Sequence, residues 1–121
     1  MSDENEDLLK NLQEKNLELS LYKARKVFLW SDVNDESARA VVTRLLSLDV
    51  EDPKAEIVLY INSPGGSVHD GMAIYDAMRA ISAPVSTVCI GMAMSMGSFL
   101  LSAGEPNRRF AWPHALSLIH I

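Results

Sequence analysis

The feature that most constrains the fold of this 121-residue chain is a regular alternation of short apolar runs and helix-prone segments. Apolar runs occupy residues 26–30, 57–61 and 85–90. A turn follows each run, and after the first two turns apolar side chains recur at steps of three and four residues, as in a helix that faces a core. This order of strands and helices is typical of right-handed parallel crossovers. The sequence therefore predicts an α/β domain built on a mainly parallel sheet.

The pattern also predicts where these elements begin and end. Residues 57–61 are continuously apolar, which favours a strand buried on both faces of the sheet. The helix before it is expected to start at Asn34 or Asp35 as N-cap and to end at Asp52-Pro53. Its core positions are expected to be Ala38, Val41, Val42, Leu45 and Leu48. Two further short strands are expected at residues 108–112 and 116–121, on either side of Pro113.

Negative charge is concentrated at the start of the chain. Residues 1–20 hold six acids and two lysines, which leaves a charge of −4 there out of a net −5. We expect residues 1–20 to form an acidic arm, either a short amphipathic helix or a mobile segment, ahead of one domain at residues 21–121. A solvated terminus and an arm that docks on a partner are the two alternatives for its role. Because the rest of the chain is near neutral, we expect no nucleic-acid partner.

Composition sets further limits on the class of protein. The single Cys89 excludes an intrachain disulfide and is expected to be a small buried hydrophobe. No apolar run is long enough for a membrane span, and the acidic start is unlike a signal peptide, so a cytoplasmic protein with no membrane partner is expected. The sequence points to no metal site and no other cofactor.

A serine lies where the third apolar run gives way to a helix, within the sequence GMAMSMGS at residues 91–98. A turn of this kind would hold the Ser95 side chain out on a bend, with the free N–H groups of a helix N-terminus beside it. That arrangement suits a nucleophile, because the N–H groups face a developing negative charge. The alternative is that Ser95 is only the N-cap of the helix that follows.

A glycine pair, Gly65-Gly66, follows the second apolar run and opens a helix. Glycine can adopt positive φ and lets another backbone approach closely. The pair is placed at the carboxyl end of a strand, where ligands bind in open α/β sheets. No Lys-Ser/Thr follows at the spacing of a phosphate loop. The alternative is an ordinary turn that starts a helix.

Acyl transfer at a serine also needs a base, an acid that orients it and N–H donors for the oxyanion. The chain has three histidines. His69 is expected to be solvated in the first turn of a helix, and His114 lies in the loop at Pro113. His120 ends the last apolar run, from where its side chain can reach the same sheet edge as Ser95. A purely structural histidine is the alternative for His120.

Several stretches of the chain match one known family. They are INSPGGSV at residues 61–68, GMAIYDAM at 71–78, VSTVCIG and AMSMGSFLL within 85–101, and RFAWP and LIH at 109–113 and 118–120. In these stretches, and over about residues 21 to 120, the chain resembles the proteolytic subunit of the Clp protease. The resemblance implies the Clp/crotonase fold and a serine endopeptidase of the Ser-His-Asp type.

The resemblance also implies roles for individual residues. Ser95 matches the nucleophile and His120 matches the general base. Gly66 and Met96 match the residues whose N–H groups form the oxyanion hole. Ser67 and Val68 match the strip of backbone that pairs with an extended peptide substrate. As partners, the family implies heptameric rings of the same chain stacked as a tetradecamer, an AAA+ unfoldase and unfolded polypeptide.

The chain departs from the family pattern at its end. In the family the triad aspartate follows the histidine, as do a helix and strand that join the two rings, whereas this sequence stops at Ile121. We therefore expect a C-terminally truncated chain. The alternative function is a non-catalytic ring subunit, or an inactive fragment that lacks the triad acid. Leu116-Ser117 and Ile121 also depart from the pattern around the histidine. If residues 116–121 are foreign sequence, His120 is not the evolved base.

Two other enzyme classes share part of this pattern. A crotonase relative that handles acyl-CoA would have the same oxyanion turn, but this reading explains neither Ser95 nor His120. A Ser-Lys peptidase would need a lysine base, and no lysine follows Lys54.

Overall fold

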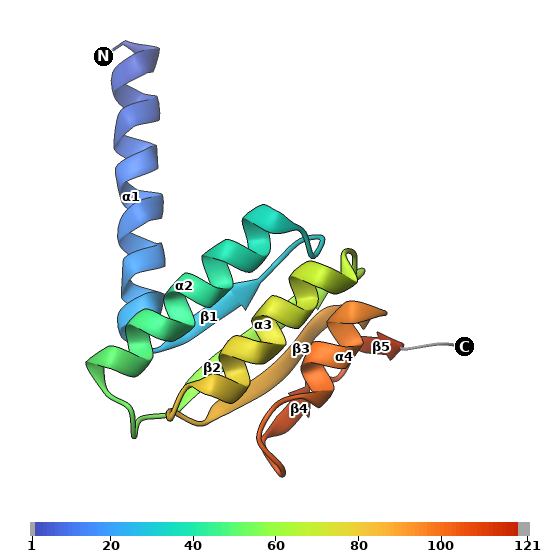
Figure 1. Ribbon diagram of the computed structural model, residues 1–121. Coiled ribbons are helices and arrows are strands. Elements are labelled where there is room, and N and C mark those ends of the chain that lie inside the picture. Colours follow the sequence, from blue (N-terminus) through green and yellow to red (C-terminus); the bar gives the residue numbers. More distant parts are fainter. Residues whose placement is uncertain (1, 119–121) are drawn as a thin grey trace.

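A five-stranded parallel sheet with helices packed on one face organises the computed structural model, which describes residues 2–118 (Figure 1). The elements in chain order are α1 (Asp3–Lys23), β1 (Lys26–Leu29), α2 (Asp35–Glu51), β2 (Ile57–Ser63), α3 (Val68–Ala80), β3 (Val85–Met94), α4 (Met96–Ser102), β4 (Arg109–Ala111) and β5 (Leu116–Leu118). β1, β2 and β3 are neighbours in that order, and both β4 and β5 pair with β3. All four pairings are parallel, which confirms the predicted α/β class.

The core lies between the sheet and the three helices that cross it, α2, α3 and α4 (Figure 1). The strands contribute Val27, Leu29, Ile57, Leu59 and Ile61, each with at most 1% of its surface exposed. α2 buries Ala38, Val41, Leu45 and Leu48 against them, four of the five positions predicted from the sequence, while Val42 is half-buried. Burial of a side chain such as Leu or Ile stabilises a fold by about 1.5–3 kcal/mol, so this layer accounts for the position of α2.

β2 is not buried on both faces, so this expectation is wrong. Burial alternates along the strand: Ile57, Leu59 and Ile61 are buried, whereas Val58 and Tyr60 are only partly so. The reason is that α2, α3 and α4 all cover the same face. On the other face Tyr60 is covered by aromatic side chains instead, with the Phe28 ring stacked at 5.1 Å and the Trp112 ring edge-on at 6.5 Å between centroids.

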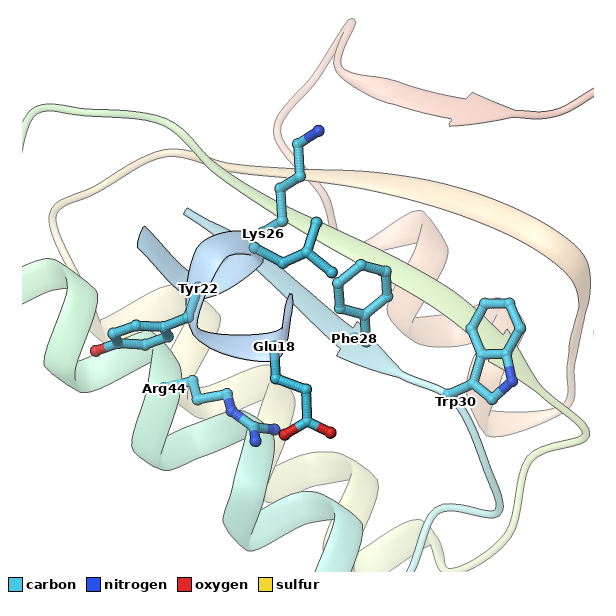
Figure 2. A pocket seen from close by; sticks show the side chains of 7 residues that line it. Glu18, Tyr22, Lys26, Phe28, Trp30 and Arg44 are labelled. Atoms are coloured by element: carbon cyan, nitrogen blue, oxygen red, sulfur yellow. The ribbon is translucent and has the colours of Figure 1, made fainter. Parts of the chain in front are cut away.

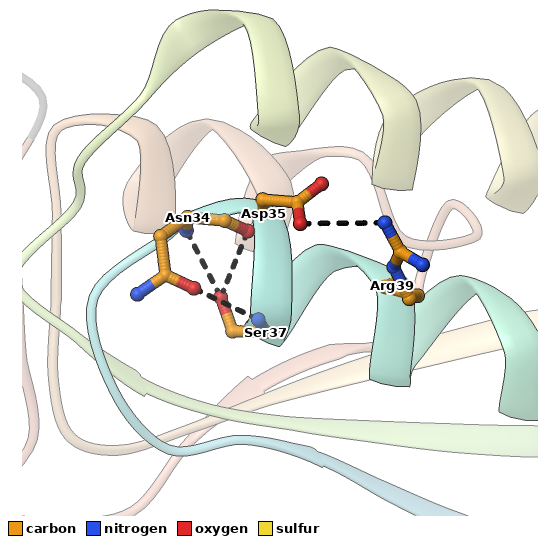
Figure 3. A network of polar contacts seen from close by, with 4 residues as sticks. All are labelled: Asn34, Asp35, Ser37 and Arg39. Carbon is orange, nitrogen blue, oxygen red and sulfur yellow. Dashed lines mark hydrogen bonds and ion pairs between the residues drawn. The ribbon is translucent and has the colours of Figure 1, made fainter.

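α2 begins at a capping box. Asn34 is the N-cap: its side chain accepts a hydrogen bond from the Ser37 N–H (2.9 Å), and the Ser37 hydroxyl accepts one from the Asn34 N–H (3.0 Å; Figure 3). Asp35, the first residue of the helix, forms an exposed ion pair with Arg39 one turn further on. The first of the two predicted N-cap residues is therefore confirmed, and the predicted stop at Asp52 is confirmed as well.

The end of α2 is held by one arginine. The Arg25 guanidinium donates hydrogen bonds to the carbonyl oxygens of Leu48 (2.9 Å), Asp52 (2.8 Å), Ala55 (2.9 Å) and Glu56 (3.2 Å). The Leu48 carbonyl also accepts from the Asp52 N–H at 3.1 Å, so Arg25 adds a second donor at the end of the helix. Its other three bonds go to carbonyls between α2 and β2, and together they fix this loop.

The acidic start of the chain is a helix, and it is longer than the short helix that was one of the two alternatives. α1 extends over 21 residues, begins at the N-cap Ser2 and has no buried residue. It projects away from the sheet and joins the domain near its last turn (Figure 1), where the Tyr22 hydroxyl donates to the Ser47 hydroxyl at 2.6 Å. None of the helices within residues 2–118 has the length and apolarity that a membrane crossing requires.

Candidate active site

The turn that carries Ser95 is tighter than the sequence predicts. The expected strand ends at Ile90, whereas β3 continues to Met94. Two pairings extend it: β5 adds to residues 92–94, and Ala93 pairs with Ser63 at the end of β2. Gly91 accommodates the accompanying register shift with φ of 73°. The change from strand to helix is therefore made at Ser95 alone.

Ser95 has a strained backbone. Its φ is 51° and its ψ is −119°, although it is not a glycine. Such conformations cost on the order of 1–3 kcal/mol and persist where the surrounding structure imposes them. Ser95 stands at the N-cap position of α4, but its side chain makes no capping hydrogen bond. The residue is exposed. A serine on a sharp, strained turn between a strand and a helix is the arrangement that presents a nucleophilic hydroxyl.

The glycine turn after β2 touches the serine turn after β3. A Cβ atom at Gly65 would lie 2.8 Å from both the carbonyl oxygen of Met94 and the Cβ of Ser95, and 3.2 Å from the Met96 nitrogen. Gly65 has φ of 103° as well. No side chain fits at this position, so the sequence requirement for glycine comes from the close approach of the two turns.

The two predicted oxyanion donors lie on these touching turns. Gly66 forms a parallel bridge with Val33, in which the Val33 N–H donates to the Gly65 carbonyl and the Ser67 N–H donates to the Val33 carbonyl, both at 2.8 Å. This bridge does not use the N–H of Gly66, and no hydrogen bond within residues 2–118 does. The Met96 N–H is the first of α4, and N–H groups in a first turn have no acceptor inside the helix.

The two residues of the predicted substrate strip, Ser67 and Val68, differ in which of their groups are free to bind a substrate. The backbone N–H of Ser67 is bonded to Val33, and its carbonyl accepts from Gly71 at 3.0 Å. Its hydroxyl caps α3 by accepting from the Asp70 N–H at 3.1 Å. Val68 follows at the first position of α3 and is 64% exposed. Val68 is thus the member of the pair whose side chain is open to a ligand, and among the described residues no acceptor is bonded to its N–H.

β5 brings residues 116–118 to the same sheet edge. Leu116, Ser117 and Leu118 pair with Met92, Ala93 and Met94. The hydroxyls of Ser117 and Ser98 lie 2.9 Å apart, which ties β5 to α4. The strand therefore ends beside the residue that precedes Ser95. The predicted base, His120, lies outside the described residues. His69 and His114 are both exposed.

Cys89 does not have the features of a reactive cysteine. Cys89 has no exposed surface, as predicted, and burial raises the pKa of its thiol, which disfavours the reactive thiolate. Within residues 2–118 no group of three or more His, Cys, Asp or Glu side chains could hold a metal ion.

A cavity of about 380 Å³ lies away from Ser95, between the last turns of α1 and the start of the sheet (Figure 2). Its lining residues are Glu18, Leu21, Tyr22, Lys26, Phe28, Trp30 and Arg44. The sequence reading did not predict it. The sequence holds no clear signal for it, because Trp30, which is exposed just after β1, reads in the sequence only as the end of an apolar run. None of the predicted site residues that the structure describes lines this cavity.

The chain is similar in sequence to known Clp proteases. A family model described as Clp protease matches residues 10–121. Over 105 residues the chain is 58% identical to the ATP-dependent Clp protease proteolytic subunit 2 of Cutibacterium acnes (strain DSM 16379 / KPA171202). That match covers 87% of this chain and 50% of the relative, so the chain spans about half the length of the curated relative that it matches.

Proposed function

The chain belongs to the Clp protease family, and on that premise we propose that it carries the nucleophile and oxyanion hole of a serine endopeptidase that cleaves unfolded proteins. The observation that carries the proposal is the Ser95 turn. Its φ of 51°, its exposed position and its missing cap bond present the hydroxyl beside a second turn, whose Gly66 N–H takes part in no hydrogen bond within residues 2–118. A serine that served only as an N-cap would need none of these features.

In the proposed mechanism the Ser95 hydroxyl attacks the carbonyl carbon of the scissile peptide bond while His120 accepts its proton. The carbonyl oxygen becomes an oxyanion and accepts hydrogen bonds from the N–H groups of Gly66 and Met96. The intermediate then expels the amine, which takes the proton from His120, and leaves an acyl group on Ser95. Water activated by the same base hydrolyses this ester and restores the serine. We assign the orienting acid to no residue of this sequence.

We propose further that the active form is an assembly of this chain, by family two heptameric rings stacked as a tetradecamer. An ATP-driven AAA+ unfoldase would supply extended polypeptide, in the cytoplasm where ATP is available. The relative's own name describes an ATP-dependent protease and a proteolytic subunit, which supports both parts of the proposal. A non-catalytic ring subunit is not favoured, since such a subunit would have no use for the strained Ser95 turn.

The test is peptide hydrolysis by Ser95→Ala, in protein expressed from the complete reading frame. We expect the variant to lose activity by about 10³-fold or more, because the nucleophile is gone, and to assemble normally. Ser102→Ala is the matched control: Ser102 is an exposed serine on the same helix, whose hydroxyl donates to the Phe99 carbonyl. Turnover by Ser95→Ala above about a tenth of the parent's would contradict the proposal.

A further inference from the structure

We propose that the hydroxyl of Ser63 is a positioning group, which holds the glycine turn in the geometry that the oxyanion hole requires. This inference rests on the proposed function, because it assigns a second residue to the same site. Ser63 is the last residue of β2 and none of its surface is exposed. It cannot meet a substrate, so any effect on catalysis must pass through the residues that it touches.

Ser63 holds the glycine turn by a hydrogen bond. Its Oγ accepts from the Gly65 N–H at 3.1 Å, in buried surroundings. A buried N–H without an acceptor costs about 1–3 kcal/mol, so this bond fixes the orientation of the peptide group that enters Gly65. The Gly65 N–H is therefore occupied, whereas no hydrogen bond within residues 2–118 uses the N–H of Gly66.

Ser63 also touches the serine turn. Its carbonyl oxygen would lie 3.0 Å from a Cβ at Gly97, the second residue of α4. Its Cα pairs with Ala93, two residues before Ser95. One buried residue therefore contacts both turns, the first through its hydroxyl and the second through its backbone.

The glycine turn depends on such anchors because of its own flexibility. Gly65 and Gly66 have φ of 103° and 146°, where glycine is free to move to other conformations. Val33 donates its N–H to the Gly65 carbonyl, which lies in the same planar peptide group as the Gly66 N–H. Ser63 holds the peptide before it, so the two anchors lie on either side of the flexible Gly65 Cα. Without the Ser63 hydroxyl only the Val33 bond orients the Gly65–Gly66 peptide, and rotation about the Gly65 bonds can tilt the Gly66 N–H. An oxyanion donor works only when it is already in place as charge develops.

The expected signature is therefore a loss of kcat at nearly constant KM. We would measure both for Ser63→Ala, Ser63→Cys and Ser63→Thr, per active serine titrated with a fluorophosphonate. The matched control is Thr87→Val. Thr87 is also fully buried, and its hydroxyl donates to the Leu101 carbonyl at 2.7 Å, so this variant too loses a buried hydroxyl bond, but one that touches neither turn.

We expect kcat to fall about 10- to 100-fold in the Ala and Cys variants, which is less than the 10²–10³ lost with a direct oxyanion donor. The affinity for a peptide aldehyde, whose adduct places an oxygen in the hole, should fall by about the same factor. Ser63→Thr, which keeps the hydroxyl, should stay within about threefold of the parent in kcat, and Thr87→Val should keep the parent's kcat per titrated site.

An unchanged kcat in Ser63→Cys, or an equal loss in Thr87→Val, would overturn the inference. If Ser63→Ala does not fold, Ser63→Cys is the deciding variant. Its thiol occupies the place of the hydroxyl but is only a weak hydrogen-bond acceptor. The outcome is separable from the proposed function: a parent whose hydrolysis survives Ser95→Ala refutes that function, whereas a parent that needs Ser95 but tolerates Ser63→Cys refutes only the role of Ser63.

Discussion

A Cβ atom on Gly65 would lie 2.8 Å from the Cβ of Ser95, so the turn that ends β2 and the turn that ends β3 are in direct contact. Their strands are parallel neighbours, which brings both carboxyl ends to one edge of the sheet. Contact between the turns then fixes the serine relative to the N–H groups of the glycine turn. The candidate site is thus a product of sheet topology and of one position where only glycine fits.

Gly65→Ala should abolish activity. The added methyl group has no room against the backbone of Met94 and Ser95, and alanine is strained at φ of 103°. We expect peptide hydrolysis per folded protein to fall by about 100-fold or more. Gly104→Ala is the control, because its Cβ would lie 2.4 Å from the Thr87 hydroxyl oxygen, a crowded place whose close neighbours are atoms of Thr87 and not of the two turns. Equal losses in the two variants would show that the effect comes from stability alone.

Arg25→Ala should destabilise the domain. Its guanidinium donates hydrogen bonds to four carbonyl oxygens at the end of α2 and in the loop that follows. Hydrogen bonds from a charged donor are among the stronger ones in proteins. We expect the free energy of unfolding, from urea denaturation, to fall by about 2–3 kcal/mol. Arg39→Ala, which removes only an exposed ion pair with Asp35, should cost about 0.5 kcal/mol or less. The same small cost for both variants would refute the role of Arg25.

Stability should decline in alkali because of Cys89. Burial raises the pKa of its thiol above the ordinary value of 9.0, so above that pH the unfolded chain releases a proton that the folded chain keeps. The stabilisation is complete below the unfolded pKa and is lost as the pH rises toward the folded one. Urea unfolding at about pH 7.5 and about pH 10 should show a larger loss for the parent than for Cys89→Ala. Parallel losses would contradict this prediction.

The helices and the sheet could be predicted from the sequence because their signals are local. The apolar spacing of α2 and its N-cap Asn34 are examples. The two-sided burial of β2 was predicted wrongly, because a continuous apolar run does not reveal that every covering helix lies on one face. On the face that no helix covers, Tyr60 stacks on Phe28. This contact joins two different strands, and the spacing of apolar residues within one strand does not encode it.

The residues of the candidate site could be proposed from the sequence, but their geometry could not. The glycine pair and Ser95 could be identified from their places after apolar runs. The φ of 51° at Ser95 could not, since it results from the pairing of β3 with β5 and from the contact with Gly65. The role proposed for Ser63 could not be predicted for the same reason: its hydroxyl bond and its contact with Gly97 exist only in the folded chain, where the two turns meet.

The most direct test of the account is the site at which a fluorophosphonate probe attaches, measured by peptide mass spectrometry on protein expressed from the complete reading frame. The account predicts a phosphonate adduct on Ser95, absent from Ser95→Ala and retained in Ser102→Ala, since only a serine with an adjacent oxyanion hole and base reacts with such a probe. No adduct on Ser95, or an adduct on another serine that survives Ser95→Ala, would contradict the account.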